Sequence, residues 1–235
     1  MTHTQIPDTL SGKPDLAVLQ RPAYRRNGGK AIFMPTKTFG PRTVKDWLAT
    51  PEGEHWELIH GNLIMTEETG DNSRLAGEIE WEIRKYLDPH PLGVVERNIA
   101  FTFHGTIDAD REGVVPDLCY IPNDQFGKWE GEAHVQKNVI PALAVEILSH
   151  STRQMDLVDK VEIYREAGVP EYWIFDRHQE TVRIYRFAEN REKPVTVHTF
   201  EETLTTPLLP GFSLEMPKVR RALRIGREAR RPSRL

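Results

Sequence analysis

The chain has 235 residues, of which 38% are hydrophobic, and its formal net charge is -4. This length fits one medium-sized domain with tails, and Cys119, the single cysteine, excludes an internal disulfide and a cysteine-based zinc site. No apolar run approaches the ~20 residues that cross a bilayer, and the first residues lack the plan of a secretory signal, so we expect a cytoplasmic protein without membrane contact.

The two ends of the sequence differ in composition from its centre. Residues 1–42 carry five prolines and no sustained period, so we expect a flexible N-terminal arm. Residues 218–235 contain eight Lys or Arg against Glu228, a charge of +7, and subtracting this from -4 leaves -11 for the rest. This basic C-terminal tail could contact nucleic-acid phosphates, or it could be a solvated or partner-binding segment. One domain then spans about residues 43–217.

The first elements of this domain are a short helix and a hairpin. Thr43 can cap a helix that runs to about Ala49. The run WELIHGNLIM at 56–65 predicts two strands that turn at His60-Gly61-Asn62 and place Glu57 in the first strand. Next, SRLAGEIEWEIRKYL at 73–87 has apolar residues at four-residue steps, which predicts an amphipathic helix.

Three runs of strand-forming residues follow: GVVERNIAFTF, VVPDLCYIP and ALAVEILS. The last is apolar almost throughout, as in a strand that is covered on both faces. A helix capped by Ser151 or Thr152 should then run to about Ala167 and stop at Gly168. The strands EYWIFD and TVRIYRF come next, with a shorter β-like tail through VTVHTF and ETLTT. The order of elements predicts an α/β fold with a mixed sheet.

Two acidic residues interrupt these apolar strands, and an ionised carboxylate is unfavourable to bury without a partner or a metal. Asp117 follows Pro116, which interrupts a strand ladder and can expose the Asp to a ligand. Glu146 lies within a central-looking strand and shares a face with Ala144. Either acid could instead serve structure alone, Asp117 as a strand end or turn and Glu146 with a buried cation. If both face one cleft, they predict Mg²⁺ or Mn²⁺.

Lys160 lies beside the apolar seam of the helix RQMDLVDKVEIYREAG, where its ammonium could turn toward the strand end that holds Glu146. The alternative is a solvated pair between Asp156 and Lys160 at i,i+4. Other patterns are weaker. His150-Ser151 has no acid partner in the sequence, and Cys119 is more typical of a small core residue than of a nucleophile.

The stretch from AVEILSHSTRQMDLVDKVEIYREAG to VPEYWIFDRHQETVRIYRF, preceded by VVPDLCYIP and HWELIHGNLIM, resembles the Uma-two-like group of restriction-endonuclease-like proteins in the PD-(D/E)XK nuclease superfamily. The resemblance covers about residues 43–190. It implies a restriction-endonuclease-like αβββαβ core and a nuclease-type site, and it favours a functional Lys160 over a surface pair.

By this resemblance, Asp117 matches the metal-binding Asp of the Pro-Asp element, and Glu146 matches the acid that opens the E-x-K element. The third position of that element is Leu148, and Lys160 matches the lysine that the group carries on the following helix. Glu57 matches an additional acidic metal ligand. The implied catalytic residues are therefore Asp117, Glu146 and Lys160, and the implied metal ligands are Glu57, Asp117 and Glu146, with no other cofactor.

The resemblance further implies metal-assisted hydrolysis of phosphodiester bonds in nucleic acid, DNA before RNA, with Mg²⁺ or Mn²⁺. In this scheme Lys160 positions the attacking water, and the carbonyl of Ile147 is a possible further ligand. A homodimer is expected by family analogy alone. Asn72 stands where many relatives have a histidine, so Asn72 and Leu148 depart from the pattern. The rival hypothesis is a catalytically silent nucleic-acid-binding or regulatory module with the same fold.

Overall fold

The computed structural model describes residues 24–27, 30–33, 39–51, 53–103, 110–131, 133 and 135–228. The chain forms two compact units, Met1–Gly40 and Pro41–Leu235. In the first unit, β1 (Tyr24–Asn27) pairs antiparallel with β2 (Lys30–Phe33). This hairpin was not predicted, although a glycine pair between short runs is a hairpin signal as well as a flexibility signal. The rest of the arm up to residue 38, and the end of the basic tail from 229, lie outside the described residues.

The second unit is built on a six-stranded mixed sheet in the order β12-β11-β10-β9-β7-β5. Its central strands, β9 (Leu143–Ile147) and β10 (Glu171–Asp176), run parallel, and every other neighbouring pair is antiparallel. The flanking strands are β5 (Gly93–Glu96), β7 (Leu118–Pro122), β11 (Thr181–Arg186) and β12 (Thr196–Thr199). Every residue of β9 and β10 is buried, as strands with both faces covered should be. The expected α/β fold with a mixed sheet is confirmed.

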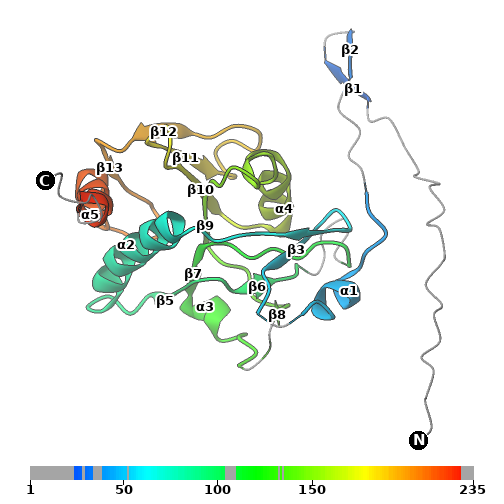
Figure 1. The fold of residues 1–235 in the computed structure, drawn as a ribbon, viewed down its shortest axis with the longest axis horizontal. Coiled ribbons are helices and arrows are strands. Elements are labelled where there is room, and N and C mark those ends of the chain that lie inside the picture. The colour runs from blue at the N-terminus through cyan, green and yellow to red at the C-terminus, as the bar shows by residue number, and fades with distance from the viewer. Residues whose placement is uncertain are drawn as a thin grey trace, which may run out of the picture. The chain divides into compact units, whose positions relative to one another are not determined.

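Side chains alternate along β9, so each face of the sheet has its own core. The odd-numbered residues of β9 pack with α2 (Gly70–Leu87) and α5 (Met216–Glu228). The even-numbered residues point toward α4 (Lys160–Ala167), where Ala144 contributes to a second core. Figure 1 shows α2 beside α5 at one side of the unit and α4 at the other. Glu146 has the parity of Ala144 and therefore points toward α4.

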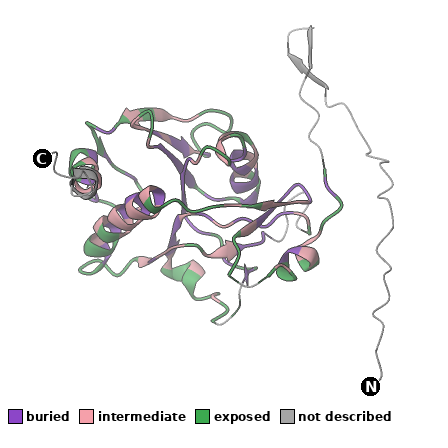
Figure 2. Cartoon of the chain, viewed as in Figure 1, coloured by how far each residue is buried: buried purple, intermediate pink, exposed green. Residues whose placement is uncertain are grey.

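The first two helices follow their predicted signals. In α1 (Val44–Leu48), the Thr43 hydroxyl accepts the backbone N–H of Asp46, and the Asp46 carboxylate accepts the N–H of Thr43 in return. Helix α2 begins at Gly70, three residues before the expected start, because the Thr69 hydroxyl caps it by accepting an N–H from its first turn. One face of α2 is buried and the other is exposed (Figure 2), as its apolar spacing predicts.

The helix that was expected to run regularly to Ala167 has a π-helical first part, η1 (Met155–Asp159), before α4. The N–H of Lys160 bonds to the Met155 carbonyl, five residues back. The Asp156 carbonyl, which would be the partner of that N–H in an α-helix, instead accepts the Tyr172 hydroxyl at 3.0 Å. Tyr172 comes from β10, so a tertiary contact satisfies the group that the wide turn releases. No local sequence signal predicts this.

The start of this helical region also differs in its cap. The Ser149 hydroxyl accepts the N–H of Thr152 at 3.0 Å, whereas Ser151 and Thr152 were the expected caps. The Thr152 hydroxyl donates instead to the side chain of Asp156 at 2.7 Å. Gly168 ends α4 in the left-handed conformation at φ 81°, as its sequence position predicts.

The predicted hairpin is present as β3 (Trp56–Ile59) and β4 (Asn62–Met65). It is attached to the chain before β7 by antiparallel bonds between Leu58 and Gly113, 2.8 Å in each direction. The ring of Trp47 lies against Gly113, since a Cβ at this glycine would come within 2.2 Å of the ring. The glycine thereby lets α1 and the hairpin approach the same backbone.

The remaining described elements are short: α3 (Asn123–Phe126), β6 (Ala100–Phe101) with β8 (Val135–Gln136), and β13 (Thr203–Leu204) with β14 (Leu214–Glu215). None of the helices in the described part of the chain combines the length and the apolar character that crossing a membrane requires.

We expect Gly113→Ala to lower the free energy of unfolding by about 1–3 kcal/mol, because the new methyl group overpacks against the Trp47 ring. Urea unfolding of the full chain measures this effect. Gly131→Ala is the matched control, since a Cβ there meets no atom within 4 Å. Equal midpoints for the two variants would contradict the close packing.

Candidate active site

Asp117 and Glu146 come together through the pairing of two neighbouring strands. The antiparallel register pairs Cys119 with Ala144 and Leu118 with Val145, and one further step places Asp117 opposite Glu146 on the same face. The N–H of Ile147 donates to Asp117 Oδ2 at 2.6 Å. The structure therefore brings these two acids together, with Asp117 immediately before β7 rather than inside it.

The hairpin brings Glu57 to the same place. Its Oε1 accepts the N–H of Val115 at 2.7 Å, two residues before Asp117. The turn of the hairpin is held by His60, whose Nδ1 lies 2.7 Å from Glu112 and whose Nε2 lies 3.4 Å from Asp159 of η1. Contacts to both the sheet side and the helix side thus fix where Glu57 lies.

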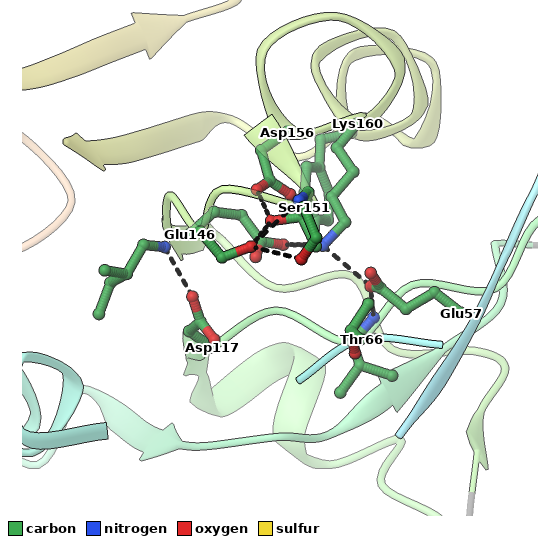
Figure 3. A network of polar contacts seen from close by, with 12 residues as sticks. Glu57, Thr66, Asp117, Glu146, Ser151, Asp156 and Lys160 are labelled. Carbon is green, nitrogen blue, oxygen red and sulfur yellow. Dashed lines mark hydrogen bonds and ion pairs between the residues drawn. The ribbon is translucent and has the colours of Figure 1, made fainter. Parts of the chain in front are cut away.

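Lys160 is buried at the centre of the carboxylates, with 2% of its side chain exposed. Its Nζ lies 2.8 Å from Glu146 Oε1, 2.9 Å from Glu57 Oε1 and 3.3 Å from Asp156 Oδ1. Figure 3 shows this ammonium pointing into the group of acids from the helix above them. The solvated surface pair of Asp156 and Lys160 is therefore wrong: the pair exists, but it is buried among two further carboxylates.

The hydroxyl of Tyr164 adds a further donor, at 2.9 Å from the Glu146 oxygen that contacts Lys160. This donor and the Thr152 hydroxyl on Asp156 were missed by the sequence analysis. Thr152, Asp156, Lys160 and Tyr164 recur at four-residue steps, so they follow one face of the helix. That polar stripe was the signal that could have identified Asp156 and Tyr164.

Asn72 lines the site from the first turn of α2, where it is buried. Its Nδ2 donates to the Ile147 carbonyl at 3.0 Å, and its Oδ1 accepts Arg177 Nε at 3.1 Å. Because Arg177 is always a donor, it sets the orientation of the Asn72 amide. Arg177 also contacts Asp71, at 3.2 Å. The sequence offers no signal for this link, since Arg177 and Asn72 are 105 residues apart.

The site is a small cavity of about 50 Å³, and its lining includes Glu57, Asp117, Glu146, Asp156 and Lys160. This volume holds only a few water-sized groups, by the rule that one water needs at least about 10–15 Å³. In the described part of the chain, no three His, Cys, Asp or Glu side chains already form a metal-binding group.

The composition of the site nevertheless suits a divalent cation. Six carboxylates and one ammonium line the cavity, so full ionisation leaves an excess of five negative charges. Carboxylate oxygens are the ligands that Mg²⁺ and Mn²⁺ prefer. Glu57, Asp117 and Glu146 could hold such an ion, and Lys160 by itself neutralises only one of the acids.

Burial and this excess of negative charge raise the pKa values of Glu57, Asp117 and Glu146. Burial raises the pKa of Asp117 to about 7, against the opposing effects of the Ile147 N–H and Lys160. Burial also raises the pKa values of Glu57 and Glu146. For Lys160, burial alone would lower the pKa, but Glu146, Glu57 and Asp156 outweigh it and raise the pKa well above its usual value. The ammonium therefore stays charged.

Two other sequence predictions are resolved by the structure. Cys119 is fully buried in the core on the α4 side, and burial raises the pKa of its thiol, so it is a core residue as expected. Leu148 is buried in the same core. The third position of the E-x-K element therefore packs in the core, and the cation beside Glu146 is Lys160 from the helix.

A family model described as "Putative restriction endonuclease" (Uma2) matches residues 42–217. Among solved structures, the chain is similar to a putative nuclease belonging to DUF820 from Anabaena variabilis, with 20% sequence identity and a TM-score of 0.65. That similarity covers 78% of this chain and 99% of the other, and it shows a shared fold. The chain has no match among curated proteins.

We expect the free energy of unfolding of the metal-free protein to fall as the pH rises from 4 to 7, because of Asp117. The pKa of this acid is raised to about 7 in the folded state from 3.8, so over this interval the unfolded chain ionises while the folded chain keeps its proton. One such group lowers the free energy of unfolding by up to about 1.4 kcal/mol per pH unit.

Asp117→Asn should remove this dependence, because the amide oxygen can still accept the Ile147 N–H but does not titrate. Urea unfolding in EDTA at a series of pH values measures both proteins. The difference in stability should grow in favour of the variant as the pH rises. Parallel curves from pH 4 to pH 7 would show that Asp117 ionises normally.

Lys160→Met should destabilise the protein by about 3–5 kcal/mol, because the three buried acids lose their shared cation while the volume is kept. Lys85→Met is the control, since that side chain is 56% exposed and pairs only at the surface of α2. Thermal and urea unfolding at pH 7 measure the difference. Equal stability of the two variants would mean that the cation is dispensable for folding.

Proposed function

Because the chain belongs to the Uma2 family, we propose that it is an endonuclease that hydrolyses phosphodiester bonds in DNA with Mg²⁺ or Mn²⁺. The family points to a hydrolase that acts on nucleic acid, and the fold agrees with it. The metal, the preference for DNA and the roles of individual residues are our proposal. A homodimer, in which two copies cut opposite strands, belongs to the same proposal.

The observation that carries this proposal is the buried contact between Lys160 and Glu146, at 2.8 Å. In the sequence the lysine of a strict E-x-K element is replaced by Leu148, which is buried in the core. The helix supplies a lysine to the same carboxylate instead. An acid pair on two adjacent strands with one lysine beside it supports a nuclease-type site better than a structural ion pair, because an ion pair needs one acid, whereas a second acid, Asp117, is buried opposite Glu146 with its pKa raised to about 7.

In this scheme Glu57, Asp117 and Glu146 would hold the ion, and the Ile147 carbonyl is a possible further ligand, since a carbonyl that accepts the Asn72 amide still has a second lone pair. A bound divalent ion lowers the pKa of a water and polarises the phosphate. Lys160 would orient that water and donate to the phosphoryl oxygens as negative charge develops on them. Tyr164 keeps Glu146 in place by its hydroxyl contact.

We expect the full chain to nick supercoiled plasmid in Mg²⁺ or Mn²⁺ and not in EDTA. Asp117→Asn and Glu146→Gln should each lower the rate by about 100-fold or more, the scale for loss of one positioned catalytic group. Glu189→Gln is the control, because this carboxylate is 56% exposed and lies outside the cavity. Nicking is followed on agarose gels.

Full nicking activity in both acid variants would overturn the proposed site. A salt-sensitive gel shift by the unaltered chain, without cleavage in either metal, would instead identify a silent nucleic-acid-binding module. Calorimetric titration with Mn²⁺ completes the comparison, because binding that is lost in Asp117→Asn and kept in Glu189→Gln assigns the ion to this cavity.

A further inference from the structure

A second cavity, of about 340 Å³, adjoins the candidate active site. It lies between α1 and the β3–β4 hairpin, and its lining includes Trp47, Leu48, Pro51 and Trp56. The two cavities are continuous in their lining, since His55, Asn98 and Val115 contribute to both. The volume is within the range of about 300–1,000 Å³ that is typical of sites for small organic groups.

Its aromatic walls are fixed before any ligand arrives. The indole N–H of Trp47 donates to the Trp56 carbonyl at 2.7 Å, and the indole N–H of Trp56 donates to Glu54 at 2.7 Å. Trp47 is buried against Gly113, while Trp56 is only partly buried and Leu48 is 51% exposed. The cavity therefore has a rigid aromatic floor and an open rim on which Leu48 and Pro51 lie beside Thr50 and Glu54.

Shared lining residues relate this cavity to the carboxylates. Trp56 and Glu57 are consecutive in β3, so their side chains point to opposite faces and their positions differ by about 3.3 Å along the strand. Each side chain therefore belongs to its own cavity, and the two cavities meet at Val115, whose N–H donates to Glu57, so a nucleotide that spans this border can place its base beside Trp56 and its phosphate beside Glu57.

We infer that this cavity binds an unpaired nucleobase next to the phosphate that is cleaved, so the preferred substrate is single-stranded or locally unpaired DNA. This inference rests on the proposed function for the position of the phosphate. A base that enters a recessed cavity must leave its pair and its stack, and aromatic side chains favour that exchange by stacking on the base. The acidic lining of the neighbouring cavity disfavours an anionic group there without a metal, whereas a neutral base, which has both an aromatic face and polar edges, suits the cavity lined by the two tryptophans and by polar side chains.

The test compares two fluorescein-labelled single strands of equal length, oligo(dT) and a strand of abasic sites, which carry equal charge. Anisotropy titrations with the full chain give Kd for each, with and without Ca²⁺. The unaltered protein should bind oligo(dT) roughly 5- to 150-fold more tightly than the abasic strand, the effect expected of one stacked base. The same oligo(dT) paired with its complement should lose this advantage.

Trp56→Ala should bring the ratio of the two Kd values close to one, whereas Trp56→Phe should keep most of it because a stacking face remains. Trp81→Ala is the matched control, since this tryptophan of α2 is 63% exposed and does not line the cavity. Leu48→Ser alters only an exposed rim position and should reduce the ratio in the same direction, which keeps the test valid if Trp56→Ala does not fold.

An unchanged ratio in both Trp56→Ala and Leu48→Ser would overturn the inference. Tighter binding of both strands by Trp56→Ala would also overturn it. Such a result would mean that another part of this chain covers the cavity in the unaltered protein and that the substitution releases it. The two proposals fail separately. Plasmid nicking with an unchanged ratio would keep the nuclease and remove the base site, whereas a ratio that responds to Trp56 without any cleavage would keep the base site and remove the nuclease.

Discussion

The ammonium of Lys160 joins carboxylates from three parts of the second unit. Glu57 comes from a hairpin, Glu146 from the centre of the sheet and Asp156 from the π-helical turn, and each contacts the same nitrogen. Burying these acids is unfavourable unless their charge is compensated, so their positions depend on one another. The Thr152 hydroxyl satisfies the Asp156 oxygen that the lysine leaves, and the Tyr164 hydroxyl shares Glu146 Oε1 with the lysine. The cavity therefore lies where three acids from different elements share one ammonium group.

Those parts of the fold that depend on a repeated local pattern were predictable from the sequence. Apolar residues at four-residue steps identified α2, and a run that is apolar almost throughout identified β9 as a central strand. The Thr43 cap and the His60-Gly61 turn are equally local, and both occur where the sequence placed them. The π-helical turn was not predictable, because its released carbonyl is satisfied by Tyr172 of a later strand. Local rules contain no information on such a partner.

In the candidate site, too, some residues were predictable from the sequence and others were not. Asp117 and Glu146 were identifiable because acids in apolar strands need an explanation, and the strand register then places them face to face. Lys160 needed the family resemblance, since its neighbours in sequence equally suit a surface ion pair. The link from Arg177 through Asn72 to the Ile147 carbonyl joins residues far apart in the chain, so it became visible only in three dimensions. The roles of Glu57, Asp117 and Glu146 as metal ligands stay predictions.

The wide turn at Met155–Asp159 has a consequence for how sequences of this kind can change in length. A π-helical turn contains one residue more than the α-helical turn that it replaces. Loss of one residue there would restore a regular α-helical turn, and the helix on either side would keep its direction. Lys160 and Tyr164 would then still face the carboxylates, whereas the Asp156 carbonyl would bond within the helix and the Tyr172 hydroxyl would no longer be its sole partner. Relatives that lack this residue should therefore be able to keep the lysine at the carboxylates.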